Sequence, residues 1–199
     1  MGRRSDHTRA QLRNLLLNKG HELMAEVGYA RFSGREVAKR AGYSVGTIYN
    51  VFGSLEGLLA AINTQTFSLW AAHLEQQLEA GSDDRIASLV RGYFSFALDN
   101  PNIWSAIYDH RLPEGKGLSP EDFEGRAQLT AIVQEEVAKA LPGNIDLDIA
   151  RYARSLIATV HGHCSYVVSG SFALLEETDP IGSALDRVRE SLAVHQQQS

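Results

Sequence analysis

The chain has 199 residues, of which 44% are hydrophobic and 22% are charged, so it can fill a core and does not have the composition of a disordered tail. No apolar run approaches the roughly 20 residues that cross a bilayer, so neither secretion nor membrane insertion is expected. Cys164 is the only cysteine, which excludes an intramolecular disulfide and a thiolate-based structural zinc site. The expected location is a reducing cytoplasm.

The charge is unevenly distributed along the chain. The net charge is −5, yet residues 1–63 contain nine Lys and Arg against five Asp and Glu. The remaining 136 residues contain ten against nineteen. A basic N-terminal part on an acidic body is typical of a phosphate-binding module joined to a part that does not bind DNA, although helical surfaces also vary by chance.

Apolar residues recur with helical period in almost every segment, which predicts an all-α protein of about nine helices. Pro101, Pro120 and Pro180 suit first-turn positions of three of them. The predicted helices cover about 8–27, 34–40, 45–51, 54–80, 84–99, 101–109, 119–141, 146–176 and 180–196.

The second and third predicted helices are short and lie close together. Ser33 followed by Glu36 predicts a capping box at the start of the second, and Gly42 follows its end. Ser44 is a suitable N-cap for the third helix, and Gly53 ends it. Two helices of about seven residues, separated by a turn that contains glycine, predict a helix-turn-helix.

The stretch from Gly28 to Ile62 resembles the DNA-binding domain of the tetracycline-repressor (TetR) family. The resemblance lies in Gly-Tyr, Val-Ala-Lys-Arg-Ala-Gly-Tyr-Ser, Gly-Thr-Ile-Tyr, and a Phe before Ser-x-Glu-x-Leu-Leu. It implies a DNA-binding transcriptional regulator, most simply a dimeric repressor that a small-molecule ligand releases from its operator. Residues 1–53 would form the helix-turn-helix domain and residues 54–199 a helical ligand-binding and dimerisation domain.

The third helix would supply the contacts to DNA, because a recognition helix presents its first residues to base edges. Gly46 would let the backbone approach the groove, and Val45 could meet a thymine methyl group. The resemblance implies phosphate contacts by Thr47 and Tyr49, although Tyr49 could also be only a surface aromatic residue. The outward residues are Ser44, Val45, Gly46, Thr47, Tyr49 and Asn50.

Basic residues outside the third helix are also candidates for phosphate contacts, with a solvated surface as the alternative. They are Arg3, Arg4 and Arg9 in an N-terminal arm, and Arg35 and Lys39 on the second helix. The chain departs from the family at Leu55, where a phosphate-binding lysine is usual. The backbone at the start of that helix, next to Ser54, could still bind the phosphate.

The C-terminal part contains the segment VHGHCSYVVSGSF, which is similar to a TetR subgroup with a His-Gly signature. Aromatic and polar residues that could converge on a small-molecule ligand are Trp70, Phe94, Trp104, Tyr108, His110, His161 and Tyr166. Each could instead be a core residue. His161 and Cys164, three apart on a helix, invite a metal-binding interpretation, but no full ligand set is evident, so neither a metal nor a cofactor is expected.

The last two predicted helices would form the homodimer interface, as the resemblance implies, because a helix-turn-helix needs a partner to bind two half-sites. No phosphate loop, nucleophile elbow or zinc-protease motif indicates an enzyme. A helical adaptor that binds only protein remains an alternative. The sequence leaves open the effector, the operator, the regulated genes, and whether the protein represses or activates.

Overall fold

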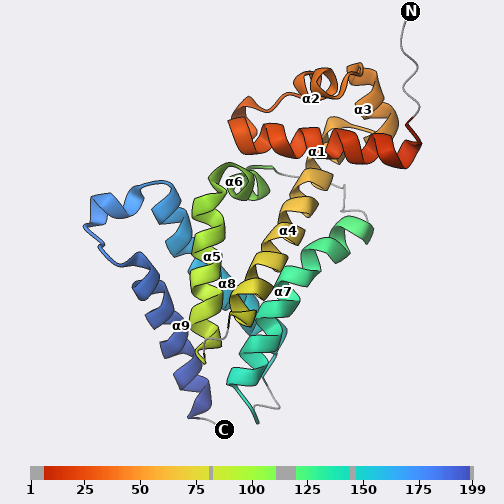
Figure 1. The fold of residues 1–199 in the computed structure, drawn as a ribbon. Coiled ribbons are helices and arrows are strands. Elements are labelled where there is room, and N and C mark those ends of the chain that lie inside the picture. The colour runs from red at the N-terminus through yellow and green to blue at the C-terminus, as the bar shows by residue number, and fades with distance from the viewer. Residues whose placement is uncertain (1–6, 81–82, 111–119, 144–146, 198–199) are drawn as a thin grey trace, which may run out of the picture. The chain divides into compact units, whose positions relative to one another are not determined.

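The computed structural model describes residues 7–80, 83–110, 120–143 and 147–197 (Figure 1). Within these ranges the chain forms nine α-helices, two short 3-10 helices and no β-strand, which confirms the predicted all-α class. The 3-10 helices are η1 (Tyr29–Arg31) and η2 (Ser171–Leu175). The α-helices are α1 (Arg9–Val27), α2 (Gly34–Ala41), α3 (Val45–Phe52), α4 (Leu55–Glu79), α5 (Arg85–Asp99), α6 (Pro101–Asp109), α7 (Pro120–Ala140), α8 (Ile149–Val168) and α9 (Pro180–Gln196).

Most helix ends lie where the sequence predicts them. The helices α6, α7 and α9 begin at Pro101, Pro120 and Pro180, where the missing backbone N–H costs nothing. The predicted helix over 146–176 is wrong beyond Val168. Gly170 adopts a left-handed conformation (φ 74°), which ends α8, and the chain then continues as η2.

The capping box predicted at the start of α2 is also wrong. Among the described residues the Ser33 side chain makes no cap hydrogen bond. Glu36 instead pairs with Arg40 and Lys39, one turn further along the same helix. A capping box does form at the start of α1, where the backbone N–H of Gln11 donates to the Thr8 hydroxyl at 3.2 Å and Thr8 N–H donates back to the Gln11 side chain at 2.8 Å.

The chain divides into two compact units. The N-terminal unit comprises Met1–Thr66 and Asn100–Glu124, and the C-terminal unit comprises Phe67–Asp99 and Gly125–Ser199. The boundary predicted between residues 53 and 54 separates a DNA-binding domain from a ligand-binding domain, not two compact units. It stays a prediction.

The N-terminal unit packs α1, α2, α3, α6 and the first part of α4 around one core. Fully buried side chains from four of these helices fill it: Leu16, Met24, Val37, Ile48, Leu58 and Ile62. The α1 and α4 helices approach closely at Gly20, because a Cβ added there would lie 2.7 Å from Cδ1 of Ile62. A larger residue at position 20 would displace the Ile62 side chain.

The C-terminal unit packs the rest of α4 against α5, and α8 against α9. Trp70 on α4 is 1% exposed and stacks on Phe96 of α5 with ring centroids 5.2 Å apart. The α8 and α9 helices are joined by a hydrogen bond of 2.8 Å between the hydroxyls of Tyr152 and Ser191. Among the described residues no single helix is long and apolar enough to cross a membrane, and the pair α3 and α4 qualifies only together, with a bend of 70° between them.

Candidate functional site

The turn between α2 and α3 depends on the backbone of Gly42. Gly42 has φ 81°, a left-handed conformation that only glycine adopts at low cost. Its N–H donates to the carbonyl of Lys39 at 3.0 Å, and Tyr43 N–H donates to the carbonyl of Ala38 at 2.8 Å. These two bonds form a Schellman motif, which ends α2 and directs the chain into α3.

The α3 helix has one buried face and one exposed face. Ile48 is 1% exposed and lies in the core with Val37, whereas Val45 is 37% exposed and Tyr49 51% exposed. Ser44, Gly46 and Asn50 are exposed as well, and Thr47 is half-buried. The structure therefore places the six outward residues predicted for this helix on α3 and its N-cap, five of them exposed and Thr47 half-buried.

Gly46 has no packing role that explains its lack of a side chain. A Cβ added there would meet only the Ser44 hydroxyl, at 3.6 Å, which is ordinary contact. Its effect is to leave the backbone of the first turn of α3 open to whatever approaches it. Ser54 has a structural role as the N-cap of α4, because its hydroxyl accepts a hydrogen bond from Gly57 N–H at 3.0 Å.

The basic residues of the helix-turn-helix fall into two groups. Arg35 is exposed, and the Lys39 side chain is 80% exposed. Arg40 instead binds Glu26 of α1 at 2.8 Å and Glu36 of its own helix at 3.3 Å, which raises the pKa of Arg40 above its ordinary value. Arg40 thus ties α2 to α1, while the other two cations stay at the surface.

Two predicted contacts, Arg3 and Arg4, lie outside the described residues. The predicted departure at Leu55 has a packing explanation. A Cβ added at Gly34 would lie 2.9 Å from Cδ1 of Leu55, so this leucine packs against the first turn of α2. Leu55 also lines a hollow of about 330 Å³ together with Phe32, Val45 and Tyr49.

The seven predicted ligand-binding residues are distributed over both units. Three belong to the N-terminal unit: Trp104 and Tyr108 of α6, whose ring centroids lie 5.2 Å apart, and His110, which caps that helix. The other four, Trp70, Phe94, His161 and Tyr166, belong to the C-terminal unit. Phe94 is completely buried, while Tyr166 is 48% exposed and packs against Phe172.

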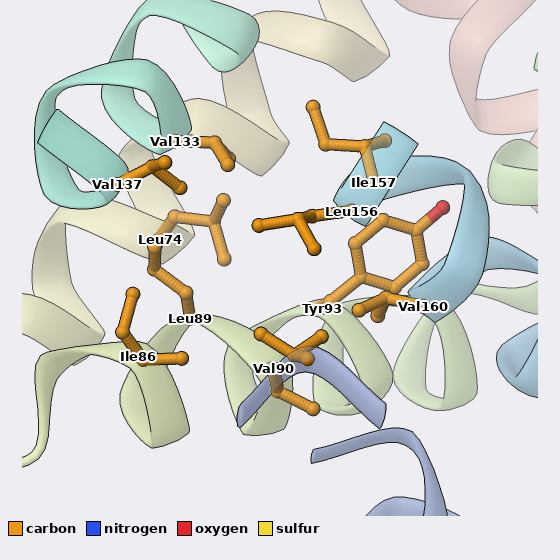
Figure 2. Close-up of a pocket in the computed structure, with 11 residues that line it drawn as sticks. Leu74, Ile86, Leu89, Val90, Tyr93, Val133, Val137, Leu156, Ile157 and Val160 are labelled. Carbon is orange, nitrogen blue, oxygen red and sulfur yellow. The ribbon is translucent and has the colours of Figure 1, made fainter. Parts of the chain in front are cut away.

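The C-terminal unit contains an apolar cavity of about 40 Å³ (Figure 2). Side chains from α4, α5, α7, α8 and α9 line it, and all of them are aliphatic except Tyr93. Six of the lining residues are Leu74, Val90, Tyr93, Val133, Leu156 and Val160. Sequence reasoning did not select these residues, because leucines and valines at helical spacing indicate a core and carry no signal of a cavity.

Two of the predicted residues touch this cavity indirectly, through Tyr93. The Tyr93 ring contacts Trp70 edge to face with centroids 4.5 Å apart, and its hydroxyl is hydrogen-bonded to Nδ1 of His161 at 3.0 Å. Burial lowers the pKa of His161 below its ordinary value, so its ring is neutral near pH 7.

Cys164, one turn beyond His161 on α8, is fully buried, and burial raises the pKa of its thiol to about 12. A thiol with such a pKa stays protonated and is a poor nucleophile and a poor metal ligand. Among the described residues, no three His, Cys, Asp or Glu side chains gather in a way that would hold a metal ion.

Two family models match the chain and together cover most of it. Residues 16–62 match the model described as bacterial regulatory proteins, tetR family. Residues 86–188 match the model described as tetracyclin repressor-like, C-terminal domain. A search of the curated proteins finds no match.

Solved structures with the same fold cover nearly the whole chain. A protein of unknown function from Rhodococcus sp. RHA1 is 23% identical, with a TM-score of 0.69 over 96% of this chain and 97% of that one. RolR in complex with resorcinol is 19% identical, with a TM-score of 0.71 over 96% and 91%. The multidrug binding protein EbrR, complexed with imidazole, is 20% identical, with a TM-score of 0.61 over 93% and 95%. With both of its parts matched by family models, the chain belongs to the TetR family of bacterial transcription regulators.

Proposed function

We propose that the protein is a cytoplasmic repressor that binds double-stranded operator DNA as a homodimer and is released by a small-molecule effector. Residues 1–53 bind the operator, and residues 54–199 dimerise and bind the effector. The protein needs no cofactor or metal for this function, and it is not an enzyme.

The observation that carries the proposal is the exposed face of α3. Ile48 anchors the helix in the core, while Val45, Tyr49 and Asn50 face outward. A helix of this size fits the major groove of B-DNA, where side chains can distinguish all four base pairs. Val45, Gly46, Ser44 and Asn50 then lie at or near base edges.

Phosphate contacts surround that central helix. Thr47, Tyr49 and Arg35 bind the phosphate backbone beside the groove, which the exposure of Tyr49 and Arg35 supports. Arg3 and Arg4 add an arm that reaches phosphates or the neighbouring minor groove. The α4 start at Ser54 offers backbone N–H groups in place of the usual lysine.

The homodimer is formed by α8 and α9. Exposed apolar side chains support this interface: Val194 on α9 is 55% exposed, and Leu174, in the η2 segment that connects the two helices, is 85% exposed. Gly162 lies on the outer side of α8, and a Cβ added there would meet nothing within 4 Å. A second copy can therefore approach α8 closely and cover these side chains.

Effector binding shifts the protein toward a conformer whose two recognition helices no longer match the half-site spacing. The helix α4 supports this route, because it begins three residues after the end of α3 and continues into the C-terminal unit as far as Glu79. RolR with resorcinol and EbrR with imidazole share the fold and hold small cyclic molecules. The seven predicted ligand-binding side chains remain candidates alongside the cavity.

The proposal is tested by fluorescence anisotropy of labelled DNA segments that flank the gene. The full-length protein should bind at least one segment more tightly than a shuffled segment, by a factor of about 10³ or more at moderate salt. Asn50→Ala should reduce this ratio, because it removes a base contact. Arg91→Ala, an exposed cation on α5, serves as the control and should bind as the wild type does.

Equal binding to flanking and shuffled DNA, across all segments, would exclude the repressor and favour a helical adaptor. Size-exclusion chromatography with light scattering gives the second result. A monomer at micromolar concentration would contradict the dimer, and Gly162→Trp should produce monomers from a dimeric wild type, because the added ring blocks close approach.

A further inference from the structure

The walls of the cavity in the C-terminal unit are hydrocarbon on every side that the described residues form. Figure 2 shows Leu74 and Val137 on one side of the view, the ring of Tyr93 on the other, Leu156 between them and Val90 below. The other lining side chains are leucines, isoleucines and valines. A ligand placed here gains from losing contact with water and gains little from hydrogen bonding.

Two pairs of polar groups beside the lining residues are bound to each other. The Tyr93 hydroxyl points away from the middle of the space in Figure 2, and it is hydrogen-bonded to His161 on α8. Arg85 and Glu136, which adjoin lining residues in the chain, are joined by an ion pair that includes a 2.8 Å bond from Arg85 Nη2 to Glu136 Oε1. A charged ligand would lose its hydration shell and meet hydrocarbon in exchange.

The volume sets the size of the ligand. A space of about 40 Å³ exceeds the roughly 10–15 Å³ that one water requires, but benzene has been found to occupy an apolar cavity of about 150 Å³ in another protein. A molecule with one ring therefore enters only if the walls move outward. Ile86, Val133 and Ile157 are lining residues that are only half-buried, so the wall is partly exposed there.

Enlarging the cavity also displaces a helix that matters for function. Leu74 lines the cavity from α4, the helix that begins at Leu55. A ligand that pushes on Leu74 thereby acts on α4 itself. Because protein interiors are close-packed, such a push moves the whole helix rather than compressing it.

We propose that the effector is an uncharged, apolar molecule of about the size of one aromatic ring, bound in this cavity by outward displacement of its walls. The identification of this molecule as the effector rests on the proposed function, whereas its binding in the cavity does not. Binding of such a molecule to the free protein is a separate property, measured without DNA.

The test uses three probes with the same ring and different charge: toluene, benzoate and benzylammonium. Calorimetric titration of the full-length protein should detect toluene binding, with a rise of a few degrees in the melting temperature at saturation. The two ions should bind at least about tenfold more weakly than toluene. Binding of either ion as tightly as toluene, or no binding of toluene close to its solubility limit, would overturn the proposal.

A matched pair of variants locates the binding site. Leu156→Ala enlarges this cavity, so it should bind toluene about tenfold more tightly than the wild type does, because the walls need to move less. Leu192→Ala on α9 removes an equally buried leucine, 5% exposed like Leu156, that does not line the cavity, and its affinity should stay at the wild-type value. Equal changes in both variants would place toluene elsewhere and refute the site.

The outcomes separate this inference from the proposed function. Toluene binding without any operator binding would leave the cavity assignment intact and refute the repressor. Operator binding that benzoate releases and toluene does not would keep the repressor and overturn the apolar effector.

Discussion

The side-chain amide of Asn102, near the start of α6, donates a hydrogen bond of 2.7 Å to the carbonyl oxygen of Ala25 near the end of α1. The last carbonyls of a helix have no partner within the helix, and Asn102 satisfies one of them. Gly28 follows directly with φ 71°, and a Cβ added there would lie 3.1 Å from Oδ1 of Asn102. Within the N-terminal unit, α6 is therefore fastened to the end of α1.

Asn102→Ala should lower the free energy of unfolding by about 1 kcal/mol, because it leaves the carbonyl of Ala25 without its partner. Asn102→Asp should cost a similar amount, since a carboxylate has no N–H to donate. Urea denaturation measures both. The control is Asn14→Ala on the exposed side of α1; if it cost as much as Asn102→Ala, the hydrogen bond would not be the cause.

Replacing each of two glycines of the helix-turn-helix by alanine should change the free energy of unfolding in opposite directions. Gly46→Ala should raise the free energy of unfolding by about 0.5–1 kcal/mol, because alanine favours the helix and the added methyl group has room. It should nevertheless weaken operator binding, because the methyl group keeps the backbone from the DNA. Gly42→Ala should lower the free energy of unfolding by about 1 kcal/mol or more, because its φ of 81° suits only glycine.

Thermal melting and anisotropy titration on the same samples separate the two glycine effects. Unchanged operator affinity in a stabilised Gly46→Ala protein would show that this backbone does not approach DNA.

Salt titration of operator binding tests the basic arm and the departure at Leu55. The variant with both Arg3→Ala and Arg4→Ala should flatten the slope of log affinity against log salt concentration by about 2, if each arginine binds one phosphate. Leu55→Lys should steepen the slope by about 1, because it restores the contact that the family usually makes. An unchanged slope in the double variant would remove the arm from the interface.

The Leu55→Lys protein should also be less stable than the wild type, because Leu55 packs against Gly34. In this variant the salt slope and the free energy of unfolding therefore change for different reasons, and each is measured separately. Arg91→Ala is again the control for a change of charge outside the N-terminal unit, and its slope should match that of the wild type.

The ion pair between Arg85 and Glu136 should make the stability depend on acid pH. The Glu136 side chain is 4% exposed, and the hydrogen bond from Arg85 lowers its pKa below the ordinary value of 4.5, against the effect of burial. A lowered pKa contributes stability that is present above the ordinary value and is lost as the pH falls through the lowered one. The loss is therefore expected below about pH 4.5.

Glu136→Gln measures that contribution. At pH 7 the variant should melt about 5 °C below the wild type, and the difference should shrink as the pH falls below about 4.5. Glu135→Gln is the control, since its carboxylate is 67% exposed and pairs with the surface Lys139 at 2.7 Å. A difference between the wild type and Glu136→Gln that is constant from pH 7 to pH 3 would contradict the assignment.

The sequence predicts the fold and the exposed face of α3 well because both depend on local patterns. Helical periodicity, proline at first-turn positions and Gly42 after α2 act within one or two turns. Two local predictions are wrong, the capping box at Ser33 and the end of the helix over 146–176. In both places two local sequence patterns favour different structures. Glu36 has Lys39 and Arg40 within one turn as alternatives to Ser33, and Gly170 ends α8 inside an otherwise apolar helical stretch.

The cavity could not be predicted, because it depends on how five helices meet rather than on any residue type. Leu74, Val133 and Leu156 are typical core residues in sequence, and only their packing leaves space between them. Aromatic and titratable residues, such as Trp104 and His161, are selected as ligand-binding candidates by residue type, whatever their position in the fold. These two belong to different compact units.

The most direct test of the central claim is selection of preferred binding sites from random duplex DNA by the full-length protein, followed by anisotropy titration of the selected site. The selected site should have two-fold symmetry, with half-sites one helical turn or a whole multiple of it apart, and Asn50→Ala should lose the preference at single positions. No enrichment, or an enriched site without symmetry that Asn50→Ala binds unchanged, would contradict the claim.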